Sequence, residues 1–322
     1  MPLFVNKKKI EDFETIEEFW AKYGDDLRAA AEKFKQMNPE AEKMKLLYVS
    51  QREYATIDWG TDNICTIGSD EATTCHVIVL HFQGTGIVSL GHIDGSKVGF
   101  GVKGMLNEMK AALCKGSVDE SIQYPSVDLY MAGGFCDNRG ISQSNTMKLL
   151  KLFMKQEINI YIQLACVSEL NDVVHEGNHW PVVYGVGVSF GKNSRFGLGL
   201  LDIYPAYFPK ENEEVIPQIT LRGARLVMDK TMRSLYDGKK KQMTIGPYDW
   251  FWDILKNDDD TRDLTDGEIR RNFSTSPLVE KPEFSQTIKE QYKYLADNVI
   301  LQSTKNQVLH YILNPEGKWV PT

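Results

Sequence analysis

The sequence lacks three features that would assign it to a membrane or nucleic-acid class. No uninterrupted apolar run among its 322 residues reaches the roughly 18 residues that a transmembrane helix requires. The opening stretch MPLFVNKKKIEDF lacks the apolar centre of a signal peptide. Basic residues are not in excess either, since 37 Lys and Arg stand against 44 Asp and Glu, whereas nucleic-acid-binding domains usually carry a basic stripe. We therefore expect a cytoplasmic protein, with the nucleus as a second compartment, that contacts neither membrane nor nucleic acid.

Cysteine is scarce and shows no pairing pattern. The five cysteines, at positions 65, 75, 114, 136 and 166, are an odd number and include no C-x-x-C pair. Disulfide frameworks and cysteine zinc sites normally show such pairs. We expect neither, and we expect most of these thiols to be plain buried side chains.

The sequence does contain enough apolar material for a sizeable core. Its composition is 42% hydrophobic and 11% aromatic. Within residues 11–45 the apolar side chains are spaced by three, four or seven among many charges, which predicts one or two amphipathic helices. We treat residues 1–45 as an N-terminal helical segment that packs on the rest of the protein.

From about residue 45 the pattern changes to short apolar runs separated by glycines. The runs HVIVLHF, IVSLGHI, VDLYMAGGF and NIYIQLACV are typical of strands. Two stretches between them, 96–113 and 142–156, have helical spacing, the second with Ser142 and Ser144 as candidate N-caps. We predict an α+β fold, a layered sandwich of mixed and antiparallel sheet with covering helices, in which residues 46–322 form a single globular unit.

Cys75 begins the first of two runs that have the pattern of a β-hairpin. CHVIVLHF is followed by QGTG and then by IVSLGHI. A turn of two residues at 83–84, or of four at 82–85, pairs Cys75 directly with His92. Opposed residues of an antiparallel pair have Cβ atoms about 4.5–5.5 Å apart on one face. A turn of three or five residues would instead put the two side chains on opposite faces.

A thiol beside an imidazole can act as a catalytic nucleophile. A cysteine with an ordinary pKa of about 8.5 is mostly protonated at neutral pH, and an adjacent imidazolium favours the thiolate. The backbone amides of Thr74 and Cys75 lie where a turn enters the strand, and they are candidates for an oxyanion hole. Ser69 could orient His92 as the third member of a triad. Two alternatives stay open: the hairpin histidines could be strand residues facing solvent, and Ser69 could be a turn residue bonded to its own backbone.

The stretch HEGNH at 175–179 matches the H-E-x-x-H pattern of zinc peptidases. That pattern works only on a helix, where both imidazoles lie on one face. Gly177 and Asn178 inside the stretch and Pro181 just after it oppose a helix. We expect His175 and His179 to be loop residues, and a zinc peptidase is kept only as an alternative hypothesis.

Several longer stretches resemble one known family. The chain is similar to the protein N-terminal asparagine amidohydrolases, which deamidate amino-terminal asparagine in the N-degron pathway. The resemblance rests on stretches that occur in the family's order: LLYVSQRE, IGSDEATTCHVIVL, GHIDG, GGFCDNR, SELND, NHWPVVYG, IGPYDW and NFSTSPL. Together they span about residues 45–285.

The resemblance implies roles for particular residues. Within the family the nucleophile is the cysteine of the GSD-x-ATTCH stretch, which here is Cys75. The spacing from Cys75 to His92 also resembles that of bacterial chemoreceptor glutamine deamidases, whose third catalytic residue is a threonine at the position that Ser69 occupies here. The implied reaction hydrolyses the side-chain amide of an amino-terminal asparagine through a thioester, and it requires no metal and no organic cofactor.

Recognition of such a substrate requires a carboxylate for its free α-ammonium. Four acids are candidates: Asp70, Glu71, Asp94 and Glu169, the last because SELND follows a predicted buried strand. The expected partners are proteins or peptides with a free amino-terminal asparagine, and we expect a monomer. The main alternative is a non-catalytic module that binds peptide amino termini.

Overall fold

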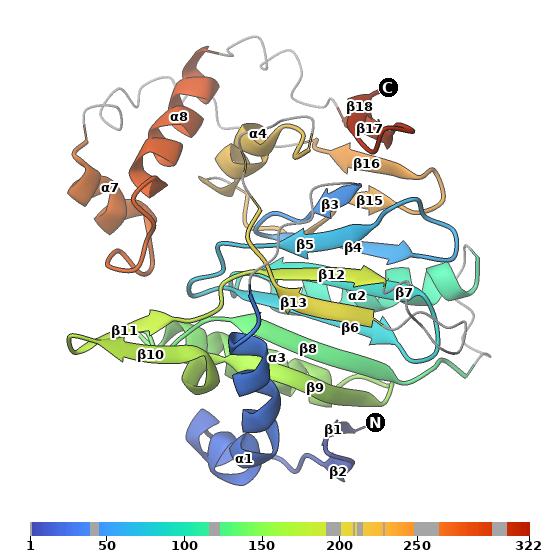
Figure 1. The fold of residues 1–322 in the computed structure, drawn as a ribbon, viewed down its shortest axis with the longest axis vertical. Helices are drawn as coiled ribbons and strands as arrows, with labels where there is room; N and C mark the ends of the chain where they lie inside the picture. Colours follow the sequence, from blue (N-terminus) through green and yellow to red (C-terminus); the bar gives the residue numbers. More distant parts are fainter. Residues whose placement is uncertain are drawn as a thin grey trace.

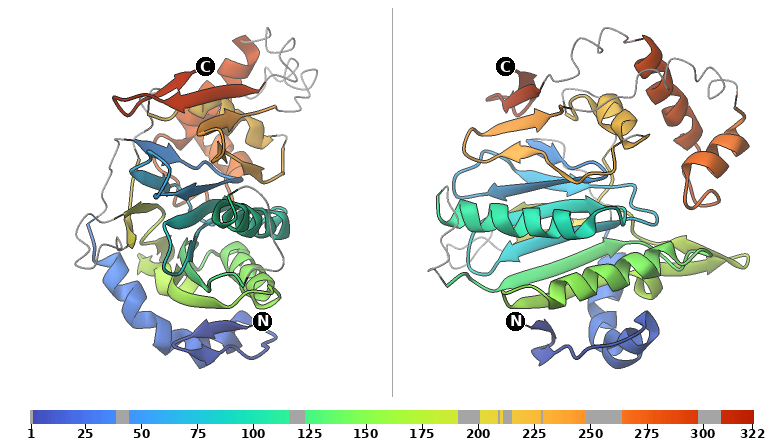
Figure 2. Two further views of the ribbon diagram at one scale, coloured as in Figure 1. Left: turned by 90° about the vertical axis from the view of Figure 1, so that its right-hand side faces the viewer. Right: turned by 180° about the vertical axis from the view of Figure 1, so that it is seen from behind.

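The computed structural model describes residues 2–38, 45–115, 123–190, 201–208, 210, 215–227, 229–247, 264–297 and 308–322. Within these residues the chain forms a layered mixed α/β structure, as predicted. A central sheet carries two helices on one face and a second, smaller sheet on the other (Figures 1 and 2). This arrangement leaves the strand ends of the two sheets close together at one edge.

The central sheet has eight strands and mixes parallel with antiparallel pairs. In spatial order the strands are β14 (Arg233–Ser234), β4 (Glu53–Asp58), β7 (Ile87–Ile93), β6 (His76–Phe82), β8 (Val127–Gly133), β9 (Ile160–Val167), β1 (Leu3–Val5) and β2 (Lys8–Lys9). Strands β4, β7, β6 and β8 pair antiparallel, whereas β8, β9 and β1 are parallel. The apolar runs that predict strands form its centre, where both faces are covered.

The remaining strands form three smaller sheets. The second layer consists of β13 (Leu201–Pro205), β12 (Val186–Phe190), β5 (Thr66–Ser69) and β3 (Leu46–Tyr48). A peripheral sheet consists of β15 (Tyr236–Asp237), β16 (Gln242–Ile245), β17 (Leu309–Leu313) and β18 (Trp319–Pro321). The remaining pair is the hairpin of β10 (Asp172–His175) and β11 (Asn178–Pro181).

The N-terminal segment contains one amphipathic helix, α1 (Ile16–Lys35). Its start is capped by Thr15, whose side chain accepts a hydrogen bond from the Glu18 amide, and acidic residues in the first turn and basic ones in the last suit the helix dipole. The apolar face, which includes Phe19, Leu27 and Phe34, is buried against β9. The N-terminal segment thus places one helix against the central sheet. The same segment also supplies β1 and β2 to the central sheet.

Helices α2 (Val98–Leu113) and α3 (Ile141–Met154) cover the other face, as Figure 2 shows from behind. Both were predicted, but the expected caps of α3 were wrong. Ser142 lies inside the helix, and the Asp137 carboxylate accepts the amides of Ile141 and Ser142 at 3.1 and 2.8 Å. An acid placed before the first turn satisfies these free amides and suits the positive end of the helix dipole.

The C-terminal part adds short helical elements above the sheets in Figure 1. These are α4 (Ile219–Ala224), the 3₁₀ turn η2 (Arg225–Val227), α7 (Asp266–Phe273) and α8 (Phe284–Asp297), and a further 3₁₀ turn, η1 (Ser168–Asn171), follows β9. Helix α7 begins with a capping box between Thr265 and Glu268. Among the helices of the described residues, none has the length and apolar character needed to span a membrane.

The register of the β6–β7 hairpin differs from the prediction by two residues. His92 pairs with Val77, and His76 with Ile93, because the turn is formed by residues 83–86. Phe82 stays in the strand, since its side chain is fully buried and its backbone pairs with Val127 of β8. Because a shift of two preserves the alternation of a strand, Cys75 still projects toward the face that carries His92. The two are diagonal neighbours instead of a direct pair.

Candidate active site

Three strand ends bring Ser69, Cys75 and His92 together. Ser69 ends β5 in the second sheet, Cys75 directly precedes β6, and His92 is the last but one residue of β7. Since β7 runs antiparallel to β6, its end lies beside the start of β6. All three residues are buried, with relative exposures of 0, 8 and 3% respectively.

The His92 ring connects the two sheets. Its Nδ1 atom lies 2.8 Å from the Ser69 hydroxyl oxygen, and its backbone carbonyl accepts the Arg52 amide at 2.9 Å. Its Nε2 atom is buried and has no hydrogen-bond partner among the residues that the structure describes. An Nδ1–H donated to Ser69 leaves the Nε2 lone pair free to accept a proton. The alternative in which the hairpin histidines face solvent is wrong for His92 and for His76, which is fully buried and lies 2.8 Å from the Thr146 hydroxyl.

The electrostatics describe a neutral resting pair. Burial lowers the pKa of His92 to about 4, although nearby carboxylates oppose the shift. Burial also raises the pKa of the Cys75 thiol well above its usual value, and the carboxylates of Asp94 and Glu280 add to this while Arg52 opposes it. The expectation of a preformed thiolate held by an imidazolium is therefore not met in the resting state. The arrangement instead suits a neutral imidazole that takes the thiol proton as the bond to carbon forms.

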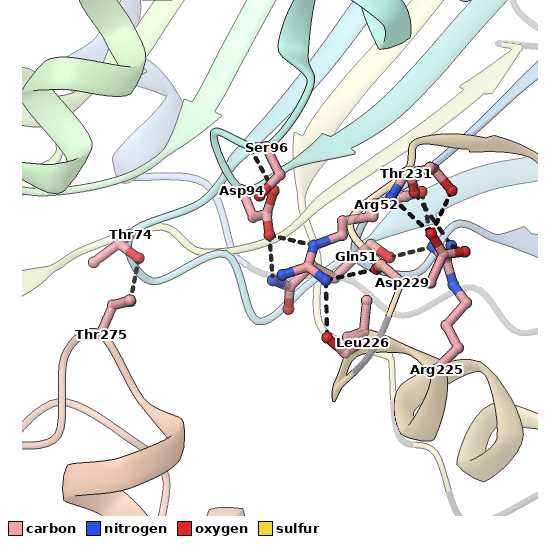
Figure 3. Close-up of polar contacts among 10 residues, drawn as sticks. All are labelled: Gln51, Arg52, Thr74, Asp94, Ser96, Arg225, Leu226, Asp229, Thr231 and Thr275. Carbon is pink, nitrogen blue, oxygen red and sulfur yellow. Dashed lines mark hydrogen bonds and ion pairs between the residues drawn. The ribbon is translucent and has the colours of Figure 1, made fainter. Parts of the chain in front are cut away.

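The loop before Cys75 presents two free amides. In the described part of the chain, neither the Thr74 nor the Cys75 N–H donates to a protein acceptor. The loop itself is held firmly: the Ala72 amide donates to the Tyr184 carbonyl at 2.8 Å, and the Thr74 hydroxyl lies 2.6 Å from that of Thr275 (Figure 3). Free, fixed amides beside a nucleophile are what an oxyanion hole requires.

A glycine at the end of β8 allows the backbone to pass close behind Cys75. Gly133 has φ of +93°, and a Cβ at this position would lie 2.7 Å from the Cys75 carbonyl oxygen and 2.9 Å from the Ala72 Cβ. A side chain here would meet both a steric clash with backbone and a strained conformation. Gly133 therefore helps to set the position of the nucleophile's backbone.

Three of the four acids that the sequence offers for substrate binding are engaged in the structure, and Asp70 and Glu71 are the first two. Asp70 is buried, and its two oxygens accept the Tyr48 hydroxyl at 2.8 Å and the Phe208 amide at 2.7 Å. Glu71 forms an ion pair with Lys210. Asp70 thus has a structural role beside the site, and the Glu71 carboxylate is already paired with the Lys210 ammonium.

Asp94 lies close enough to act on the charge state of both Cys75 and His92. Its carboxylate accepts Arg52 at 2.5 Å, Gln51 at 3.3 Å and the Ser96 amide at 2.8 Å (Figure 3). Burial opposes its ionisation, but the Arg52 charge and these hydrogen bonds hold the pKa of Asp94 below its usual value. Asp94 is therefore an ionised carboxylate at the site whose oxygens both have partners.

Glu169 is not brought into this group. It is an exposed residue of η1, and the charged groups that act on its carboxylate are Glu17 and Arg28 of α1. Its proximity in sequence to a buried strand did not predict on which side of the sheet it would lie.

One acid at the site was missed from the sequence. Glu280, two residues after the NFSTSPL stretch, lies near enough to Cys75 to raise the pKa of its thiol. Ser276 connects this segment to the catalytic loop, since its hydroxyl donates to Thr73 at 3.1 Å and lies 3.4 Å from the Glu280 carboxylate. The only signal in the sequence was that an acid follows closely on a stretch shared with the family.

The HEGNH stretch forms a hairpin and not a helix. His175 pairs with Asn178 and Val174 with His179, so the two imidazoles project from opposite faces of the β10–β11 ribbon. The helical zinc-peptidase hypothesis is therefore wrong, and so is the expectation of loop residues. His179 instead lies 2.6 Å from the Asp172 carboxylate, in a group with Cys136 whose donor atoms are mutually within 4.8 Å.

Neighbouring strand ends carry a buried thiol, an imidazole whose Nε2 has no partner among the described residues, and two amides without a described acceptor. These features define a candidate hydrolase site with a cysteine nucleophile. Comparison with known proteins makes the class specific. Residues 36–321 match the profile of the protein N-terminal asparagine amidohydrolase family. The chain belongs to this family, as the sequence resemblance implied, and it is an amidohydrolase.

Curated relatives with that name come from animals and plants. The proteins of Sus scrofa and Homo sapiens are each 35% identical to this chain over 284 residues, which cover 85% of this chain and 83% of each relative. The protein of Arabidopsis thaliana is 26% identical over 270 residues, which cover 79% and 74%. The similarity thus extends well beyond the site itself.

Proposed function

We propose that this protein hydrolyses the side-chain amide of an amino-terminal asparagine in proteins and peptides, giving amino-terminal aspartate and ammonia, and so feeds the N-degron pathway. The observation that carries the proposal is the His92 imidazole, which is bonded to Ser69 through Nδ1, has no partner at Nε2 among the described residues, and belongs to the strand face toward which Cys75 projects. Family membership supports the substrate, and the geometry supports the reaction type.

In the first step the Cys75 sulfur attacks the carboxamide carbon. Its proton passes to Nε2 of His92, and the carbonyl electrons move onto oxygen to form a tetrahedral oxyanion. The amides of Thr74 and Cys75, which donate to no protein acceptor among the described residues, would hold that oxyanion. Removal of one such donor typically costs roughly 3–4 kcal/mol of barrier.

In the second step the imidazolium returns the proton to the amide nitrogen. The C–N bond breaks, ammonia leaves, and a thioester remains on Cys75. Proton transfer of this kind contributes about 10²- to 10⁴-fold in rate. The Ser69 hydroxyl, which accepts from Nδ1–H, stabilises the imidazolium and holds the ring in the required tautomer.

Water then completes the reaction. His92, neutral again, takes a proton from the water as the oxygen attacks the thioester carbon. The sulfur leaves and regains a proton from the imidazolium, and the product carries an aspartate side chain. Each proton that leaves a nucleophile is returned to a leaving group through the same nitrogen.

The test is mass spectrometry of peptides that begin with Asn, Gln or acetyl-Asn, with the ammonia released measured in parallel. We expect conversion of amide to acid only for the free amino-terminal Asn peptide, and none with Cys75→Ala. A protein that only binds amino termini would retain the peptide but release no ammonia in either form. Equal turnover by wild type and Cys75→Ala would overturn the proposed nucleophile.

A further inference from the structure

The segment from residue 274 to 281, on the C-terminal side of α7, forms a wall of the site opposite the catalytic loop. Thr275 contacts Thr74 at 2.6 Å (Figure 3). Ser276 contacts Thr73 at 3.1 Å. The half-buried Glu280 lies behind these contacts, with Oε1 near the hydroxyls of Ser274 and Ser276. This carboxylate is therefore fixed beside the two residues that precede Cys75.

Glu280 differs from the other acids at the site because no cationic side chain of the described residues forms an ion pair with it. Asp70, Glu71 and Asp94 are engaged as described above. Arg270 acts on the Glu280 charge, but its guanidinium donates to backbone carbonyls of residues 277 and 280–282. In the described part of the chain, the Oε2 atom of Glu280 accepts no hydrogen bond. Burial raises the pKa of this carboxyl, as expected for a charge that lacks a counter-ion.

Of the two carboxylates that act on Cys75, Asp94 is ion-paired with Arg52, whereas Glu280 forms no ion pair among the described residues. Asp94 and Glu280 both act on Cys75, and Glu71 acts on Glu280, so the site has several carboxylates around the nucleophile. The neighbouring Lys281 does not neutralise Glu280, because its ammonium lies 3.8 Å from the centre of the Tyr207 ring and 5.2 Å from that of Tyr184. A positively charged ligand group would be attracted here, and an acetylated amine would lose that attraction.

We propose that Glu280 accepts the α-ammonium of the substrate and so selects a free amino terminus. This inference rests on the proposed function and adds the residue that recognises the substrate's charge. It replaces Glu169, Asp70 and Asp94 as the main candidate for that role. It also links recognition to reactivity: a bound ammonium offsets the carboxylates that oppose thiolate formation at Cys75, so the nucleophile is favoured when the correct substrate is present.

The experiment compares two peptides that differ only in the substrate's charge. One begins with asparagine, and the other begins with a succinamoyl group, which keeps the carboxamide but has hydrogen in place of the α-amine. Kinetics are measured for wild type and Glu280→Gln, whose amide can still accept from Ser274 and Ser276. The matched control is Glu283→Gln, which neutralises an exposed acid three residues further on.

We expect Glu280→Gln to lower kcat/KM for the asparagine peptide about 10- to 100-fold, the usual cost of losing a hydrogen bond to a charged group, and not to lower kcat/KM for the succinamoyl peptide. In the absence of substrate, the same change should increase alkylation of Cys75 by iodoacetamide, since one opposing negative charge is gone. Glu283→Gln should change neither quantity.

The inference is overturned if Glu280→Gln lowers kcat/KM equally for both peptides, or if the wild-type protein has the same kcat/KM for both. The succinamoyl peptide could turn over too slowly for kinetics. In that case calorimetry compares the binding of the two peptides to Cys75→Ala protein. An absence of ammonia release from the asparagine peptide with wild type would count against the proposed function itself, which separates the two failures.

Discussion

A buried imidazole with one fixed partner can exchange protons only through its other nitrogen. In His92 the fixed partner is the Ser69 hydroxyl, on a strand of the other sheet, and the other nitrogen has no partner among the described residues. The proposed proton transfer therefore depends on a hydrogen bond between two sheets. The sequence offered Ser69 as a residue that could orient His92. It could not exclude that Ser69 was an ordinary turn residue.

Replacement of Ser69 tests this bond. Ser69→Ala should lower kcat about ten-fold, the value of one hydrogen bond, while KM changes little, because the ring loses its orientation but the substrate contacts remain. Ser89→Ala is the matched control, since Ser89 is also fully buried and bonded to another hydroxyl, that of Thr56. Steady-state ammonia release measures both. Equal losses in the two variants would mean that Ser69 acts only through folding.

The pH dependence of kcat/KM reports the protonation state of His92. Because only the neutral ring can accept the thiol proton, activity should be lost as the pH falls through the pKa of about 4 that burial gives His92. We expect kcat/KM to stay constant from pH 7 down to about pH 5, instead of falling near the usual histidine pKa of about 6.5. His92→Ala should abolish turnover and slow the alkylation of Cys75 near neutral pH. An acid limb near 6.5 would contradict the neutral pair.

The acidic residues show how far the sequence could predict the site at the residue scale. Asp94 could be expected near the site because it follows His92 by two residues. Glu280 could not, since more than 200 positions separate it from Cys75 along the chain and only the folded structure brings them together. Glu169 failed for the opposite reason: a residue next to a buried strand can face either side of the sheet.

At the scale of elements, strand alternation predicted more than strand register did. The shared face of Cys75 and His92 follows from the period of two, which a shift of two residues leaves intact. The register itself was wrong because the turn takes in Thr85 and Gly86 while Phe82 stays in the strand. The Thr85 amide and hydroxyl both donate to the Phe82 carbonyl, and Phe82 pairs with β8, a contact that hairpin patterns do not contain.

The turn after β8 should tolerate no side chain at Gly133. Gly133→Ala is expected to lower thermal stability and to abolish most activity, because the new Cβ would meet the Cys75 carbonyl. Gly140→Ala is the control, since Gly140 also has a positive φ, +65°, but no atom lies within 4 Å of its added Cβ. Melting curves and ammonia release should show a mild stability loss for Gly140→Ala with activity retained. A Gly133→Ala enzyme with normal turnover would show that the close approach does not position the nucleophile.

Helix α2 contains a buried acid whose ionisation should oppose folding. Burial raises the pKa of Glu108 to about 7, and its Oε2 has no hydrogen-bond partner among described residues. A carboxyl with a raised folded-state pKa favours the folded state while it is protonated, and this is lost as the pH rises through that value.

Glu108→Gln should therefore stabilise the protein at pH 8, by on the order of 2 kcal/mol, and the gain should shrink below pH 7 and vanish near pH 4.5. Thermal or denaturant unfolding at a series of pH values measures this. Glu316→Gln, at an exposed position, should show no such dependence. A gain that does not change with pH would mean that the side chain acts through packing alone.

At the scale of the whole molecule, the site lies where two sheets and a C-terminal segment meet. The layered fold and the helical cover followed from periodicity, because each amphipathic element must bury one face against another layer. The approach of residues 274–281 to the catalytic loop did not follow, since contacts between residues so far apart in sequence leave no local pattern. The fold thus adds to the site a segment, residues 274–281, whose approach to the catalytic loop hydrophobic patterning alone does not predict.

The central claim is that Cys75 becomes covalently bonded to the substrate carbonyl while His92 moves the protons. Its most direct test is rapid acid quenching of wild-type enzyme during turnover of an amino-terminal asparagine peptide, followed by intact and peptide-level mass spectrometry. The account predicts an adduct on Cys75 with the mass of the peptide less one ammonia, which hydroxylamine removes. Ammonia release with no adduct at any time point, together with undiminished turnover by Cys75→Ala, would contradict it.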